Sequence, residues 1–187
     1  MSLIVFGHAF SSYTWKVLIA LHENATPFEF RQVGPDQPAN TAEWLQRWPL
    51  RKFPLLVDGE RQVVETSIII EYLQQAHPGP VQLIPEEAAL ALEVRFMDRF
   101  FDLHVMDAAQ HAVNGALTGD AGKRSEGLAL SAEKLERAYG WLETRLAGMT
   151  WATGEAFALA DCAAAPALFY ADWVHRIGER YPVLRGY

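Results

Sequence analysis

The stretch from Arg51 to Tyr72 constrains the fold more than any other part of the chain. Two short apolar runs, 53–57 and 63–64, flank the pair Asp58–Gly59, a dipeptide typical of a tight hairpin turn. A hydroxyl residue follows, and after it come apolar positions at helical spacing. The stretch therefore predicts strand, turn, strand and helix in direct succession.

Two points in this stretch could bind a ligand. Pro54 opens the first strand, and a cis bond there would leave the N–H and C=O groups of Phe53 free to pair with an extended ligand. An ordinary proline at a strand start is the alternative. Glu65–Thr66 stands at the end of the second strand, where the free N–H groups of a helix start attract a carboxylate. The alternative is that Thr66 is a plain helix cap.

The residues before this stretch predict two more strands and two more helices. The apolar run Leu3–Phe6 and the run Phe28–Val33 are typical strands, and a helix with apolar residues at helical spacing lies between them and ends at Asn24. A short helix is expected over Thr41–Trp48. Strands joined through a helix run parallel, whereas a hairpin is antiparallel. The sequence thus predicts an α/β domain with a mixed four-stranded sheet.

Beyond His77 the pattern changes to helices alone. Two prolines and a glycine mark a linker, so we expect a first domain over residues 1–77, a linker over 78–84 and an all-helical bundle over 85–187. Apolar stripes predict bundle helices over 86–110, 125–147 and 160–174, with a last short helix over 176–181. The helix over 160–174 is so apolar that it should be the buried centre of the bundle.

Charge and cysteine content exclude several classes of function. The net charge is -7 and no basic run is present, which argues against binding to nucleic acid or to anionic membranes. The single cysteine, Cys162, excludes an intramolecular disulfide and a multi-cysteine metal site, and we expect it to be an inert core residue. No signal peptide or membrane-length run is apparent, so a soluble cytoplasmic protein is expected.

Ser11 and Ser12 lie in the loop between the first strand and the first helix. Backbone N–H groups and the helix dipole favour a negative charge there, and a hydroxyl group could donate to a bound thiolate, whose pKa is lowered at a helix start. Helix capping is the alternative role for both serines. A second candidate cluster, His104, Asp107 and His111, shares one helix face. It fits the wall of a substrate cavity or plain surface better than a metal site, because the spacing exceeds one turn.

Four motifs together resemble the soluble glutathione S-transferase family over nearly the whole chain. They are Ser11–Val17, similar to the serine-type active-site motif of the zeta class; Lys52–Pro54, similar to a Lys-Val-Pro segment with a cis proline; the pair Glu65–Thr66; and Phe157–Asp161, similar to the cap of the buried helix. The resemblance implies a thioredoxin-like N-terminal domain followed by a helical-bundle C-terminal domain.

The resemblance also implies roles for individual residues. Ser11 would donate a hydrogen bond to the sulfur of glutathione, and Phe53 would pair its backbone with the cysteinyl part, with Pro54 enforcing the geometry. Lys52 would face the glycine carboxylate, and Glu65–Thr66 would hold the γ-glutamyl end. The thiolate would then attack a small electrophile, in a detoxifying reaction that needs no metal.

The resemblance further implies an electrophile pocket and a partner subunit. Phe10, His104, Asp107 and His111 are the candidates for the pocket. A two-fold homodimer is expected, with the first helix of the bundle, near Asp98 or Asp102, at its interface.

Some residues depart from the family pattern. Thr66 replaces the usual serine but keeps its hydroxyl group, and Ala158 replaces the usual Ser or Thr cap, so half of a capping box is absent. Phe6 stands where tyrosine-type members place their catalytic hydroxyl, and no cysteine occupies 11–14, which disfavours dithiol reductase chemistry. The sequence stops at Tyr187, earlier than most members, which leaves the second substrate open.

Three functions remain open on the sequence. The first is conjugation of glutathione to an electrophile. The second is a zeta-like, glutathione-dependent isomerisation, suggested by Ser11–Ser12 and Trp15. The third is a non-catalytic member of the family that serves as an interaction module.

Overall fold

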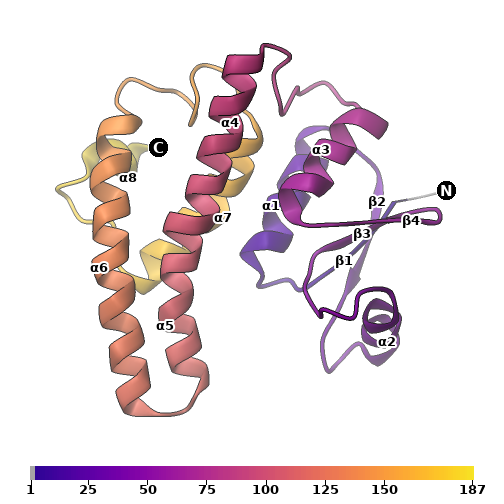
Figure 1. Cartoon of the computed structure of the whole chain (residues 1–187), viewed down its shortest axis with the longest axis horizontal. Helices are drawn as coiled ribbons and strands as arrows, with labels where there is room; N and C mark the ends of the chain where they lie inside the picture. Colours follow the sequence, from indigo (N-terminus) through magenta and orange to yellow (C-terminus); the bar gives the residue numbers. More distant parts are fainter. Residues whose placement is uncertain (1–2) are drawn as a thin grey trace. The chain divides into compact units, whose positions relative to one another are not determined.

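The computed structural model describes residues 3–187, and the chain divides into two compact units, Met1–Pro85 and Glu86–Tyr187 (Figure 1). The elements of the first unit are β1 (Leu3–Gly7), α1 (Ser12–Glu23), β2 (Phe28–Gln32), α2 (Pro38–Arg47), β3 (Leu55–Asp58), β4 (Arg61–Val64) and α3 (Thr66–Ala76). This order confirms the predicted succession of strands and helices.

The four strands form one mixed sheet in the order β2-β1-β3-β4. β1 runs parallel to β2, with Val5 opposite Phe30, because the connection between them contains α1. β3 is antiparallel to both β1 and β4, as the tight turn at Asp58–Gly59 requires. The predicted mixed four-stranded sheet is therefore confirmed.

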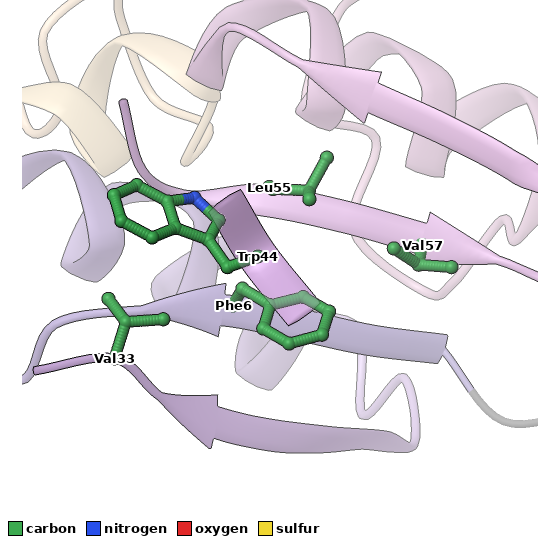
Figure 2. Packing of buried hydrophobic residues seen from close by; sticks show 5 residues of the cluster. All are labelled: Phe6, Val33, Trp44, Leu55 and Val57. Carbon is green, nitrogen blue, oxygen red and sulfur yellow. The ribbon is translucent and has the colours of Figure 1, made fainter. Parts of the chain in front are cut away.

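Helices cover both faces of this sheet. α1 and α3 pack against each other on one face, and α2 lies on the other (Figure 1). Beneath α2 the buried side chains of Phe6, Val33, Trp44, Leu55 and Val57 form one hydrophobic cluster (Figure 2). Because side chains alternate along a strand, Leu3 and Val5 of β1 and Leu56 of β3 face the other side, toward α1 and α3. The sheet is thus buried on both sides, which gives the loops at its ends a rigid base.

The helix boundaries differ from the sequence prediction at α2. We expected a helix over Thr41–Trp48, and the helix runs over Pro38–Arg47. Pro38 occupies the first helical position, where a proline is well tolerated because its missing N–H group would have no partner in the helix.

The segment after α3 is tied to the first unit. The Oδ1 atom of Asn24 accepts a hydrogen bond from the backbone N–H of Val81 at 2.7 Å. The side-chain amide of Gln74 bonds both the N–H and the C=O group of Ile84, each at 2.8 Å. The stretch predicted as a linker, 78–84, is therefore held by side chains of α1 and α3 as it crosses the first unit.

The second unit contains helices joined by loops. They are α4 (Ala88–Phe100), the π-helical segment η1 (Phe101–Met106), α5 (Asp107–Leu117), α6 (Ala121–Arg145), α7 (Leu159–Val174) and α8 (Pro182–Gly186). The helix predicted over 86–110 is thus a continuous run whose middle segment is a π-helix. α5 packs closely along α6, and the buried hydroxyl group of Ser131 bridges the C=O of Ala108 and the N–H of Ala112.

α7 is the buried helix of this unit, as the sequence predicted. It packs against α4, η1, α5 and α6, and most of its side chains are buried. None of the helices within residues 3–187 is both long and apolar enough to cross a bilayer.

The prediction of a last helix over 176–181 was wrong, because the helix occupies Pro182–Gly186. A proline disfavours the helical conformation at the residue before it, here Tyr181, yet suits the first position of a helix. Pro182 therefore begins the helix instead of following it.

Candidate active site

The loop after β1 places Ser11 at the start of α1. Ser11 is the N-cap residue, with φ -90° and ψ 121°, and its Oγ atom accepts a hydrogen bond from the N–H of Thr14 at 3.1 Å. A hydroxyl group has one proton to donate besides the lone pairs that accept. Within residues 3–187 no acceptor takes the proton of Ser11, so it can be donated to a ligand.

Close packing between the strand end and the helix start fixes this loop. A Cβ atom at Gly7 would lie 2.6 Å from the Cγ2 atom of Thr14, so only glycine lets the buried Thr14 side chain approach. The Oγ1 atom of Thr14 also accepts a hydrogen bond from the N–H of His8 at 3.3 Å. Contacts of Gly7 and His8 with Thr14 therefore fix the start of α1, and with it Ser11, relative to the end of β1.

The second site segment is Lys52–Pro54, directly before β3. The Phe53–Pro54 peptide bond is cis, the isomer that the family resemblance implies. Neither the N–H nor the C=O group of Phe53 has a hydrogen-bond partner in the described part of the chain. Lys52 is exposed, and its C=O group accepts a hydrogen bond from Nε1 of Trp44 at 3.1 Å. The backbone at Phe53 is thus available to an extended ligand.

The third segment is the start of α3. Glu65, not Thr66, is the N-cap residue, so the alternative interpretation of Thr66 as a plain helix cap is wrong. Glu65 has a left-handed backbone, with φ +68°, and its exposed side chain makes no capping hydrogen bond. Thr66 is the first helical residue and is buried. The first N–H groups of α3 therefore lack a side-chain cap from Glu65, which suits them to a carboxylate ligand.

The sheet register brings these three segments to one edge. Phe6 of β1 is opposite Leu55 of β3, so the chain leaving β1 lies beside the chain entering β3. Leu55 in turn is opposite Val64 of β4, which places Glu65 beside Pro54. The rings of His8 and Phe53, with centroids 6.1 Å apart, mark the contact between the first two segments.

An apolar cavity of about 530 Å³ lies beside this edge. It is lined by His8 and Phe53 and by apolar residues of α2 and the loop before it, among them Pro35, Ala42 and Leu45. The volume falls in the range of small-molecule sites, roughly 300–1,000 Å³.

The structure also shows a buried charge that the sequence analysis missed. Lys16 of α1 is 1% exposed, and its Nζ atom donates to the Oγ atom of Ser67 in α3 at 3.1 Å. The spacing of the sequence could have indicated this burial. Ser12, Lys16 and Ala20 are four residues apart, which places the lysine on the buried face of α1.

The four residues predicted to line the electrophile pocket are divided between the two units of the chain. Phe10 is 78% exposed, and its ring lies 5.8 Å from that of His8. In the helical unit, His104 helps line a cavity of about 320 Å³, and Nε2 of His111 accepts a hydrogen bond from Nζ of Lys134 at 2.7 Å. Asp107 is exposed and does not line that cavity.

Two further observations concern the helical unit. A larger cavity, of about 660 Å³, lies beside α7 and α8 and contains none of the predicted site residues. Across residues 3–187, no three His, Cys, Asp or Glu side chains gather as a metal ion would require.

Comparisons with known proteins agree on one family. The family model for the glutathione S-transferase N-terminal domain matches residues 5–81, and that for the C-terminal domain matches residues 106–187. A probable maleylacetoacetate isomerase of Vibrio cholerae is 28% identical over 99% of this chain and 88% of its own length.

Solved structures show the same fold. A glutathione S-transferase of Pseudomonas fluorescens superimposes with a TM-score of 0.83 and 21% identity, covering 99% of this chain and 92% of its own. One of Methylobacterium radiotolerans, in complex with glutathione sulfonate, gives a TM-score of 0.82 and 27% identity, covering 100% of this chain and 88% of its own. With the four-stranded mixed sheet and the helical unit that follows it, these matches show that the chain belongs to the glutathione S-transferase family.

Proposed function

We propose that this protein is a glutathione transferase in which Ser11 holds the glutathione thiolate for attack on a small electrophile. The observation that carries the proposal is the meeting, at one sheet edge, of an uncommitted hydroxyl proton, an unpaired backbone segment and an uncapped helix start. These groups match a thiolate, a peptide backbone and a carboxylate, which are the parts of glutathione.

Each segment then has a role in the bound complex. Ser11 donates to the sulfur, which the positive end of the α1 dipole also favours as an anion. The backbone of Phe53, next to Pro54, pairs with the cysteinyl residue. Lys52 meets the glycine carboxylate, and Glu65–Thr66 at the start of α3 holds the γ-glutamyl end. Holding the thiolate beside the electrophile supplies proximity as well as an activated nucleophile.

The substitution Ser11→Ala tests the role of the hydroxyl group. Loss of one charge-assisted hydrogen bond to the thiolate, about 1.5–3 kcal/mol, should lower the rate of thiol transfer roughly 10- to 100-fold. The affinity for glutathione, measured by calorimetry, should fall much less, because the other segments still bind the tripeptide. The exposed Ser125→Ala substitution on α6 is the matched control and should change neither quantity. Equal losses in rate and affinity for Ser11→Ala would contradict the proposal.

A second candidate function is glutathione-dependent isomerisation. It is favoured by the Vibrio cholerae relative, a probable maleylacetoacetate isomerase that aligns with 99% of this chain. Assays with a maleylacetoacetate analogue and with chlorodinitrobenzene, each with and without glutathione, separate the two activities. A protein that fails to bind immobilised glutathione would instead support a non-catalytic module.

We further propose that the protein is a two-fold homodimer in the cytoplasm with a role in detoxification. Exposed apolar side chains on α4 and η1 support the dimer: Leu92, Phe96 and Leu103 are 69%, 46% and 55% exposed. Beside them the rings of Phe100 and Trp141 stack with centroids 4.2 Å apart. A contiguous apolar stripe on a helix surface is typical of a protein interface.

A further inference from the structure

The buried lysine of α1 has no part in the roles proposed above. Lys16 is 1% exposed and lies one helical turn after Ser12, whose side chain is also buried. Lysine is almost never fully buried unless its ammonium group has polar partners, because removing the charge from water is costly. A methionine of similar length would fill the same space without that cost, so the ammonium group itself requires an explanation.

The hydrogen bond of Lys16 to Ser67 connects it with the proposed site. Its Nζ atom donates to the Oγ atom of Ser67, the second residue of α3, at 3.1 Å. Side chains on a helix lean toward its N-terminus, so the ammonium group of Lys16 lies toward the first turn of α1, where Ser11 is the cap. The contact therefore joins the first turns of the two helices whose starts form the proposed glutathione site.

We propose that Lys16 is a positioning residue for glutathione, which fixes the start of α3 relative to Ser11 and adds a positive charge beneath both helix starts. The inference rests on the proposed function. The hydrogen bond to Ser67 sets the distance between the binding point of the γ-glutamyl carboxylate and that of the sulfur. The charge favours the ionised forms of both groups.

Other titratable groups lie on or next to the same two helices. They are His8 before α1, Glu65 at the N-cap of α3 and Glu71 in the second turn of α3. The two carboxylates oppose the effect of Lys16 on a bound anion. Lys16 is the lysine of α1, and the sequence of α3 contains no lysine or arginine.

The substitution Lys16→Met tests both effects. We expect the affinity for glutathione and for S-methylglutathione to fall about tenfold, because the start of α3 is no longer held by a charged hydrogen bond. The pKa of the bound glutathione thiol, followed by thiolate absorbance, should rise by about one unit. Ser67→Ala should lower both affinities in the same direction, and the double variant should lose less than the two single losses combined. Lys123→Met, at an exposed lysine of α6, is the matched control.

The outcomes separate this inference from the proposed function. A purely structural lysine would change the midpoint of urea unfolding and leave the thiol pKa and both affinities unchanged, which would overturn the inference. Hydrogen exchange of the Ile69 amide, which bonds the C=O of Glu65 at 2.8 Å, reports on the α3 start without any ligand. About tenfold faster exchange in Lys16→Met supports the tether, and unchanged exchange overturns it. A wild-type protein that binds neither tripeptide overturns the proposed function, while the exchange result still decides whether Lys16 holds α3.

Discussion

Ser11 caps α1 with the same hydroxyl group for which we propose a role toward the glutathione sulfur. Its oxygen accepts from the N–H of Thr14 and so caps α1, while its proton has no acceptor in the described part of the chain. The two roles do not compete, because accepting uses a lone pair and donating uses the proton. Capping also fixes the rotamer of the side chain, so the donor is oriented before a ligand arrives.

A second single residue, Asp58, makes the stability of the first unit depend on pH. Its Oδ2 atom accepts hydrogen bonds from Nε2 of His77 at 2.6 Å and from the hydroxyl group of Tyr72 at 2.7 Å. The bonds from His77 and Tyr72 hold the pKa of Asp58 below its usual range. A carboxylate whose pKa is lowered by folding stabilises the protein above its unfolded pKa, about 3.9, and loses that contribution as pH falls through the folded pKa.

The loss of stability caused by Asp58→Asn should therefore depend on pH. At pH about 7 the variant should have a lower free energy of unfolding than the wild type, and the difference should shrink as pH falls below about 4. Urea unfolding at a series of pH values measures this difference. Asp36→Asn, at an exposed carboxylate of the same unit, is the matched control. A gap between Asp58→Asn and wild type that stays constant over the whole range would show that the carboxylate charge is not involved.

Residues that belong to a local motif could be predicted from the sequence, whereas those defined by a distant contact could not. Ser11 and Glu65 were found because strand and helix patterns placed each at an element boundary. Thr66 is a candidate cap of α3 on the sequence because hydroxyl residues favour that position, but the N-cap is Glu65, whose backbone is left-handed. Lys16 was missed because its partner, Ser67, lies 51 residues away.

Among the elements, α7 begins with an incomplete cap. The Oδ2 atom of Asp161 accepts from the N–H of Ala158 at 2.8 Å, which is one half of a capping box. The N-cap residue, Ala158, has no hydroxyl group for the other half, although its backbone, with φ -143° and ψ 179°, is extended. The Oδ1 atom of Asp161 also accepts from the N–H of Ala152 and from the hydroxyl group of Tyr187, so this carboxylate joins three parts of the helical unit.

Restoring the missing half should stabilise the protein. Ala158→Ser supplies an oxygen for the first-turn N–H groups of α7, and we expect the free energy of unfolding to rise by about 1 kcal/mol. The measurement is urea unfolding at constant pH. Ala165→Ser, at an exposed position inside the same helix, offers no cap and should be neutral or slightly destabilising. Equal effects of the two substitutions would show that capping does not limit the stability of this helix.

Helices were predicted well where an apolar pattern extends over many residues. They were predicted less well where tertiary packing determines the type of helix. The buried helix α7 follows from its apolar composition, which no surface helix would carry. The π-helical segment η1 could not be foreseen, because the sequence pattern of Phe101–Met106 is compatible with an ordinary helical turn. This segment packs against α4, α5, α6 and α7.

For the whole molecule, the strand order and the change to helices alone were enough to predict the fold class. They do not specify which residues of the first bundle helix would form the proposed dimer interface. We expected that surface near Asp98 or Asp102, yet these side chains are 1% and 5% exposed. The exposed apolar residues Leu92, Phe96 and Leu103 lie on the same helical run, at positions that a composition-based argument does not distinguish from core residues. Burial depends on which helix face packs inward, and that requires the tertiary structure.

The proposed homodimer can be tested on this stripe. Phe96→Asp puts a charge in the middle of the exposed apolar face, and a buried unpaired carboxylate would strongly disfavour association. We expect light scattering at micromolar concentration to give a dimer for the wild type and a monomer for the variant, with the helical content by circular dichroism unchanged. Trp173→Asp, at an aromatic residue of α7 that is 73% exposed against 46% for Phe96, is the control and should remain dimeric. A wild-type monomer would end the proposal, and a dimeric Phe96→Asp variant would place the interface on another face of the molecule. Neither outcome would bear on the proposed glutathione site, because its residues all belong to the first unit and are tested by the substitutions described above.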